Sequence, residues 1–270
     1  MEDYKLNISP ARRHFKQRIG QVNHFMITTL VGLDGVKTGK YTLSDEFKTS
    51  WNPRDINRSV ERSVRFVLDS TLSWVIDNLD SYFIEAVRKP SIIESESLNA
   101  EYNKAERSVN KRFLAFYNEA KKEDGELEIY ASLVALAIQW RNKTVHFGAD
   151  NIIDPEFEEI LKANKELYFR EFRHLNIVDT LKSFKNDGHP SFKEVASMIH
   201  GIHKYVECVD RFLLSHLNLE RFKKDLIDKH YSDYHNSKKK CNNYSDKRKV
   251  IFYQTMFRQY GFEIVGDDND

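Results

Sequence analysis

Apolar residues recur every three or four positions along most of this chain, and almost no stretch alternates apolar and polar residues with a period of two. The first spacing places apolar side chains on one face of an α-helix, whereas alternation is typical of a half-buried strand. The pattern therefore predicts a chain built almost entirely from helices. The helices are expected over residues 11–33, 54–88, 100–122, 127–148, 155–174, 177–185 and 190–217.

Glycine and proline positions indicate where several of these helices begin and end. Gly35 and Gly39 are expected to end the first helix. Pro53 is a helix-start signal for the second, and Pro90 stops it. A break is expected near Asn164, because the apolar residues of that helix lose their regular spacing.

The helix expected over 54–88 is the longest, and its roughly 35 residues would span on the order of 50 Å. We expect it to form the backbone of a bundle. Its buried face is expected to consist of Val60, Val64, Val67, Thr71, Trp74, Leu79, Tyr82 and Ala86. Residues 1–10 are expected to be a loose lead-in, and residues 34–52 a loop or short hairpin.

The low content of turn-forming residues supports the same fold class. Only ten glycines and five prolines occur in 270 residues, which favours long helices over a many-stranded sheet. We therefore predict an all-α protein, an antiparallel helical bundle. The expected division is a helical domain over 1–217 and a basic, partly helical C-terminal extension over 218–270.

Composition places the chain among soluble proteins. Hydrophobic residues make up 40% and charged residues 31%, and the net charge of +1 means that any basic surface has to be local. No run of 18 apolar residues occurs, and the N-terminus lacks the apolar core of a signal peptide. Two cysteines without a CxxC pair predict no disulfide framework. We expect a cytoplasmic protein that does not enter a membrane.

The segment from Arg221 to Lys249 is locally basic. It holds ten Lys or Arg residues against four Asp, with Tyr231, Tyr234 and Tyr244 interleaved. Such a segment either contacts the RNA backbone or is a solvated helix and loop. The RNA contacts are predicted for Lys238, Lys239, Lys240, Lys247, Arg248 and Lys249.

Signatures of several common active sites are missing from the sequence. It contains no glycine-rich phosphate loop, no H-E-x-x-H and no G-x-S-x-G. His200 and His203 lie three residues apart on one expected helix, but no carboxylate or cysteine has a convincing metal-ligand spacing. Cys208 lies among valines and is expected to be a small core residue. We therefore predict no metal site and no cofactor.

The stretch 127–148 joins an apolar helix to a polar end. Arg141 continues the face of apolar residues, and His146 follows it within the hexad RNKTVH. A guanidinium is costly to bury without a partner. Either Arg141 reaches solvent and His146 caps the last carbonyls, or the helix end presents a cation and a titratable base to an anion.

The Arg–His spacing carries no information by itself. With 17 Arg and 10 His, about two cases of an Arg followed by a His after four to six intervening residues are expected by chance, and three occur. Only Arg141 is followed by a polar amide, Asn142, and only there does a long apolar helix end in a glycine two residues after the histidine. Asn142 and His146 are four residues apart and therefore stacked on a helix.

An apolar helix followed by Arg-Asn-x-x-x-His-x-Gly in an all-α bundle resembles the HEPN family (higher eukaryotes and prokaryotes nucleotide-binding). The family signature is Arg, four to six residues, then His, with Asn, Asp or His favoured after the Arg. Arg141, Asn142 and His146 match it position by position, and the resemblance covers about residues 11–217. It implies a metal-independent endoribonuclease, a homodimer whose two motifs face each other, and a role in toxin–antitoxin or antiphage systems, with an antitoxin or other defence-system partner.

The residue types suit that chemistry, because RNA supplies its own nucleophile in the 2′-OH. Arg141 is expected to bind the phosphate and stabilise its charge, His146 to act as the acid or base, and Asn142 to orient them. Lys143 is expected to add an RNA contact. Two alternatives stay open: a catalytically inactive module that binds RNA or nucleotides, and a helical protein-interaction subunit.

Overall fold

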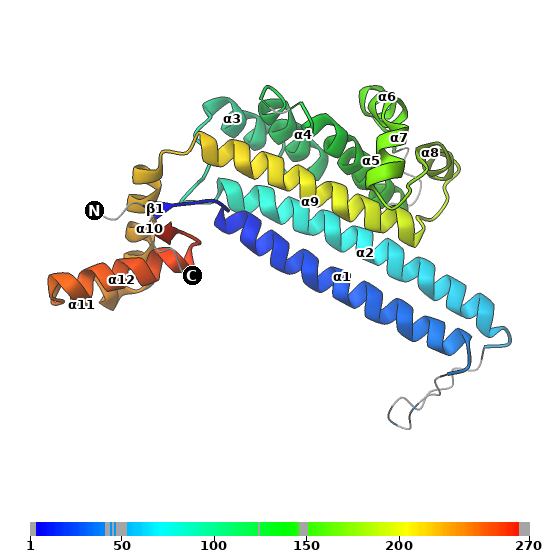
Figure 1. Cartoon of the computed structure of the whole chain (residues 1–270), viewed down its shortest axis with the longest axis horizontal. Coiled ribbons are helices and arrows are strands. Elements are labelled where there is room, and N and C mark those ends of the chain that lie inside the picture. The colour runs from blue at the N-terminus through cyan, green and yellow to red at the C-terminus, as the bar shows by residue number, and fades with distance from the viewer. Residues whose placement is uncertain are drawn as a thin grey trace. The chain divides into compact units, whose positions relative to one another are not determined.

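The computed structural model describes residues 4–40, 44, 46, 53–123, 125–145 and 151–264. Within them the chain forms twelve helices and two strands of two residues each, which confirms the all-α class (Figure 1). In chain order the elements are β1 Tyr4–Lys5, α1 Pro10–Lys37, α2 Ile56–Val87, α3 Glu96–Lys104, α4 Val109–Ala120, α5 Leu127–Val145, α6 Pro155–Ala163, α7 Lys165–Glu171, α8 Ile177–Lys185, α9 Phe192–Ser215, α10 Leu219–Asp233, α11 His235–Asn242, α12 Asp246–Gln259 and β2 Glu263–Ile264.

Most of the expected helices are confirmed, and the predicted break at Asn164 separates α6 from α7. The first helix is longer than expected, because α1 continues through Gly35 to Lys37. Gly39, with a φ of +69°, then ends it. The amide of Lys40 donates to the Gly35 carbonyl at 2.9 Å, and the amide of Gly39 donates to Val36 at 3.2 Å. This is the hydrogen-bond pattern of a glycine-terminated helix.

The single helix expected over 100–122 is wrong. The chain forms α3 and α4 there, separated at residues 105–108. Glu106 adopts a left-handed φ of 50°, and the Ser108 hydroxyl accepts the amide of Lys111 at 3.3 Å. Serine at this position satisfies a free amide of the first turn and so starts a new helix. The apolar spacing continued across the gap and concealed that start.

The expected loose lead-in contains a short strand. Tyr4 and Lys5 of β1 pair antiparallel with Ile264 and Glu263 of β2. The Tyr4 ring lies 5.0 Å from the ring of Phe257 on α12. The predicted loop over 34–52 lies within α1 up to Lys37, and most of the remainder lies outside the described residues.

The chain divides into two compact units. Unit 1 consists of Met1–Lys16, Asp80–Leu127 and Val206–Asp270. Unit 2 consists of Gln17–Leu79 and Glu128–Tyr205. Because α1, α2 and α9 each contribute residues to both units, residue 217 is not a boundary between them. The division of the chain at 217 stays a prediction about domains.

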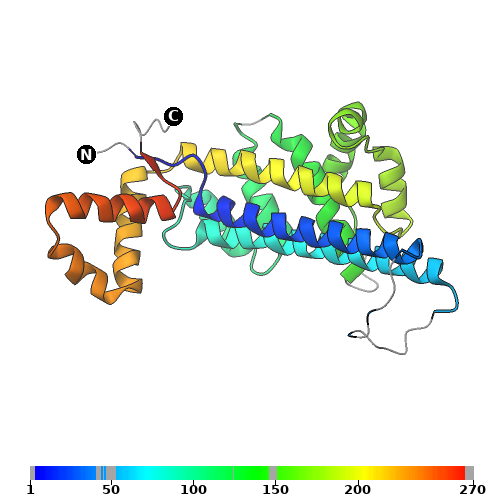
Figure 2. The same ribbon diagram turned by 60° about the horizontal axis from the view of Figure 1, so that its bottom comes forward.

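Unit 2 is a helical layer around α5. The parts of α1 and α2 that belong to it run side by side in both views (Figures 1 and 2). The α5 helix packs against α9 so closely that a Cβ added at Gly201 would meet the Leu133 Cβ at 3.0 Å. The short helices α6, α7 and α8 gather beside α5 (Figure 1). Completely buried core residues of this unit include Leu72, Val75, Ile76, Leu133, Leu136, Ile138 and Ile202.

Unit 1 has an aromatic core in which side chains of α2 and α4 meet. The rings of Phe83 and Phe116 are 4.7 Å apart and both are buried. Beside them, Asp210 of α9 is completely buried and accepts hydrogen bonds from the amide of Ser9 at 3.1 Å and from the Ser9 hydroxyl. Burial raises the pKa of Asp210, and the Ser9 hydrogen bonds oppose that rise.

Candidate functional site

The α5 helix is buried on nearly all sides, not only on the single face that the sequence indicated. Every side chain from residue 131 to residue 138 is buried. A helix that is apolar all round is stable only inside a core. Val145, which lies four positions after Arg141 on the same helix face, is 49% exposed. The helix therefore runs through the core of unit 2 and reaches the surface over its last turn.

Arg141 lies in that last turn and is held by two neighbours. Its Nη2 atom lies 2.9 Å from Oδ1 of Asp77 on α2, and its Nη1 donates to Oδ1 of Asn142 at 3.3 Å. The Arg141 side chain is only 20% exposed, whereas that of Asp77 is 65% exposed. The Arg141 Nε is buried and has no hydrogen-bond partner among the described residues. The guanidinium is therefore fixed at the surface by one edge.

Lys143 and Thr144 hold the end of α5 in place. The Thr144 hydroxyl donates to the carbonyl of Arg141 at 2.9 Å. The Lys143 ammonium donates to the carbonyl of Phe184 at 3.0 Å and to Asp187 at 2.9 Å, and lies 4.5 Å from the Phe184 ring centre. Lys143 thus ties α5 to the end of α8. Its predicted contact with RNA stays a prediction.

The predicted acid–base residue, His146, belongs to residues 146–150, which lie outside the described residues. Its role therefore stays a prediction. Of the three predicted catalytic residues, Arg141 and Asn142 lie in contact, and Asp77 joins them from α2.

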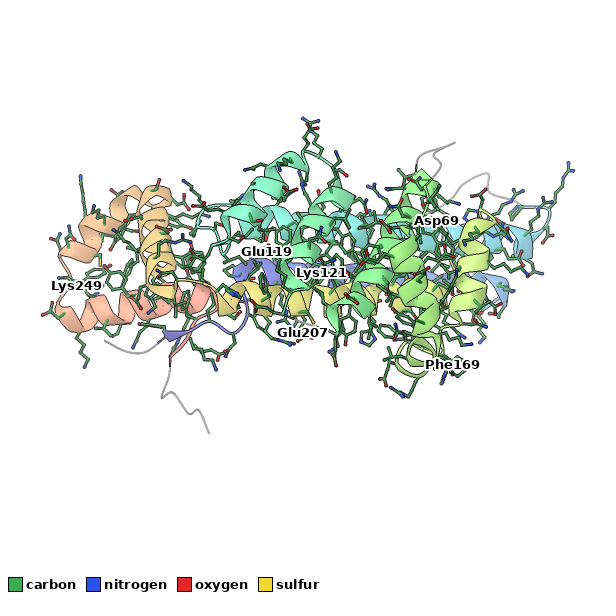
Figure 3. All side chains as sticks on the ribbon, turned by 90° about the horizontal axis from the view of Figure 1, so that it is seen from above. Asp69, Glu119, Lys121, Phe169, Glu207 and Lys249 are labelled. Atoms are coloured by element: carbon green, nitrogen blue, oxygen red, sulfur yellow. The ribbon has the colours of Figure 1, made fainter. Side chains whose placement is uncertain are left out.

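The predicted basic RNA-binding residues lie in unit 1, on α11 and at the start of α12. Their side chains are exposed except for that of Lys249, which is partly exposed and is labelled in Figure 3. The Arg248 guanidinium lies 4.4 Å from the Tyr244 ring centre, and the Lys238 ammonium 6.0 Å from that of Tyr231. Both are cation–π contacts, and they confirm that cations and tyrosines are interleaved in space.

A histidine–aspartate pair in unit 2 was not indicated by the sequence reasoning. His189 Nδ1 lies 2.8 Å from Oδ2 of Asp69 on α2; Asp69 is labelled in Figure 3. Burial is the main cause that raises the pKa of Asp69, and the His189 hydrogen bond opposes it. The turn before His189 is held because Trp140 Nε1 donates to the carbonyl of Gly188 at 2.9 Å. No local sequence pattern predicts a pair formed across 120 positions.

One further expectation on α2 is wrong. Trp74 was expected on the buried face and is 58% exposed. The helix turns its aliphatic residues to the core at positions 68, 72, 75, 76 and 79 instead, which leaves Trp74 on the opposite side. Asp77, the partner of Arg141, lies three residues further along α2.

Among the described residues, no group of three or more His, Cys, Asp or Glu could hold a metal ion. The His200 ring lies 4.9 Å from the Phe172 ring, and burial lowers the pKa of His200. Cys208 is buried, as expected for a core residue.

Comparison with protein families, with curated proteins and with solved structures gives no match for this chain. The membership of the HEPN family that the motif implies therefore stays a prediction. None of the described helices is long and apolar enough to cross a membrane.

Proposed function

We propose that this protein is a metal-independent endoribonuclease of the HEPN type, and that its site lies at the end of α5. The proposal is carried by Arg141. Its guanidinium sits at the surface end of a buried helix, fixed by Asp77 and Asn142, and followed by the histidine of the motif. A planar, oriented cation of this kind recognises phosphate through paired N–H donors.

In the proposed reaction the RNA 2′-oxygen attacks the adjacent phosphorus while a base removes its proton. The bond from phosphorus to the 5′-oxygen breaks, and an acid protonates that oxygen. The products are a 2′,3′-cyclic phosphate and a 5′-OH. Arg141 stabilises the charge that grows on the phosphate oxygens, and His146 exchanges the protons. Asp77 and Asn142 hold the guanidinium.

The reaction needs a base and an acid, and one motif supplies one histidine. A two-fold homodimer that brings two motifs together satisfies this requirement. In this proposal the protein acts as a toxin or antiphage effector in the cytoplasm, and an antitoxin or another defence-system protein restrains it.

The test is cleavage of a labelled single-stranded RNA in the presence of EDTA. Wild type is expected to cut, and Arg141→Ala and His146→Ala to lose at least about 100-fold in kcat. Arg211→Ala and His216→Ala are the matched controls, because they have the same spacing outside the motif. Full activity in either motif variant would refute the site.

If no variant and no wild-type sample cuts RNA, binding measurements distinguish the two remaining classes. Salt-sensitive RNA binding without cleavage identifies an inactive binding module. Lack of RNA binding identifies a protein-interaction subunit.

A further inference from the structure

The exposed side of α2 carries an arginine stripe at its N-terminal half. Arg58, Arg62 and Arg65 are separated by four and three residues, so their side chains lie on one helical face. All three are exposed, and exposed Arg54 lies two residues before the start of the helix at Ile56. Nothing in the apolar packing of unit 2 requires these cations.

Within the described ranges, none of the four guanidiniums forms an ion pair or a side-chain hydrogen bond. Arg65 is attracted by the carboxylate of Asp69, about one turn further along α2. Asp55 caps α2 by accepting the amide of Arg58 at 3.0 Å, and Asp69 and Asp77 are engaged with His189 and Arg141. Glu61 is the remaining acidic residue of α2 before Asp69. Arginines left free on one face present five donors each to an external anion.

Two exposed aromatic rings accompany the arginines. Phe66 follows Arg62 by four residues and is 73% exposed. Trp74 lies two turns further along α2 and is 58% exposed. At about 100° per residue it points about 160° round the helix from Arg58, and Phe66 lies between them at about 80°. Large exposed rings near cations are typical of surfaces on which nucleic-acid bases stack, because every base offers a flat face. They also follow α2 toward Asp77, which holds Arg141.

A groove borders the stripe where α2 meets the end of α1 and the turn before α9. It has a volume of about 480 Å³, and its lining includes Lys37, Arg65 and His189 together with the acidic residues Asp34 and Glu61. His189 is oriented through Nδ1 by Asp69, so its other ring nitrogen is the one able to bind a ligand. The first turn of α9 is closed by its own cap, since the amide of Ser191 donates to Glu194 at 2.6 Å.

We propose that the exposed surface of α2 from Arg54 to Trp74, which winds partly round the helix from the arginines past Phe66, is a binding track for single-stranded RNA. The arginines contact phosphates, Phe66 and Trp74 stack on bases, and the strand runs along α2 toward Arg141. The distance along the helix from Arg58 to Asp77 is about 28 Å at 1.5 Å per residue, which several nucleotides can occupy.

Charge favours RNA over a second copy of this chain as the occupant. A two-fold interface uses the same patch on both copies. The unpaired arginines of both copies would then be buried against each other. Glu61 would be the main anion of the stripe available to neutralise them. A polyanion supplies the missing negative charge directly. The choice of RNA over other polyanions rests on the proposed function, whereas the basic and aromatic character of the track does not.

The test measures binding of a fluorescent oligouridylate of about 12 nucleotides, a length within the usual site sizes, by anisotropy at several salt concentrations. The full-length protein carries His146→Ala throughout, so that cleavage does not interfere. Three variants are compared in this background: Arg58→Gln/Arg62→Gln/Arg65→Gln, Phe66→Ala/Trp74→Ala, and the matched control Lys165→Gln/Arg173→Gln/Lys182→Gln. The control removes three exposed charges from the same unit, outside α2.

The arginine variant is expected to reduce the slope of log affinity against log salt by about 2, because each single-strand phosphate contact contributes about 0.7. The aromatic variant is expected to weaken binding at least fivefold with the slope unchanged, since stacking releases no counterions. The control is expected to change neither.

Equal slopes in the arginine variant, the control and the parent would overturn the track. So would an aromatic variant that binds RNA normally but converts a dimer into a monomer in sedimentation, because the face would then join two copies. If the arginines of the track contribute to RNA binding but wild type does not cleave RNA, the proposed nuclease is refuted and the track is not. If wild type cleaves RNA but the arginine variant binds RNA normally, the track is refuted and the nuclease is not.

Discussion

Gly201 lies where α9 crosses α5, the helix that positions Arg141, and the consequence of replacing it can be worked out from two opposing effects. Alanine in a helix interior is about 1 kcal/mol more favourable than glycine. At this position, however, the added Cβ would meet the Leu133 Cδ1 at 2.9 Å and its Cβ at 3.0 Å. Leu133 is completely buried, and its Cβ moves only with the α5 backbone.

Overpacking of this kind costs about 1–3 kcal/mol. Gly32 on α1 supplies the matched control, because a Cβ there would meet nothing within 4 Å. The helix-propensity gain is common to both substitutions and cancels in their comparison. Gly201→Ala is therefore expected to be less stable than Gly32→Ala by about 1–3 kcal/mol.

Urea unfolding followed by circular dichroism gives the midpoint and slope for each variant. We expect Gly32→Ala to raise the urea midpoint above that of wild type. We expect the free energy of unfolding of Gly201→Ala to be lower than that of Gly32→Ala by the stated margin, with equal slopes for the two variants. If the two variants are equally stabilised, α5 and α9 are not packed closely at Gly201, and the reasoning fails.

Three further predictions concern the cap of α8, the buried Asp210 and the partner of Arg141. The Asn176 side chain accepts hydrogen bonds from the amides of Val178 at 3.1 Å and Asp179 at 3.3 Å. Asn176→Ala is therefore expected to lower the free energy of unfolding, measured with urea, by about 1 kcal/mol, and Asn176→Ser to retain most of that stability. Burial raises the pKa of Asp210, so the folded state keeps a proton that the unfolded state releases near its ordinary pKa of about 4; wild type should therefore lose stability relative to Asp210→Asn as the pH rises above about 4, and a gain in stability there would contradict the burial argument. Because Asp77 is 65% exposed, Asp77→Ala should change the free energy of unfolding by less than about 1 kcal/mol, yet lower kcat for RNA with partial recovery in Asp77→Glu; an unchanged kcat would show that Asp77 does not position Arg141.

The sequence predicted the fold wherever apolar spacing and helix signals agreed. The α2, α8 and α9 helices and the break at Asn164 follow directly from that agreement. The missed start of α4 had a signal, Ser108, that a continuous apolar pattern concealed. The β1–β2 pairing could not be read from the chain, because two-residue strands have no periodicity and their partners are almost a full chain length apart.

The candidate site was only partly predictable for a related reason. The sequence singled out Arg141 and Asn142, which do lie together. Their partner Asp77 and the His189–Asp69 pair come from segments 64 and 120 positions away, and contacts of that kind depend on tertiary packing. The exposed position of Trp74 was hidden by its apolar character. The arginines at 58, 62 and 65, in contrast, have a helical spacing that is visible in the sequence itself.

The chemistry of the RNA ends after cleavage in EDTA tests the central claim most directly. Wild type is expected to leave a 2′,3′-cyclic phosphate and a 5′-OH on every cut, detectable by mass spectrometry of a defined single-stranded RNA, and Arg141→Ala to leave the RNA intact. Cuts that carry a 5′-phosphate and a 3′-OH, or cuts that appear only after Mg²⁺ is added, would contradict the account.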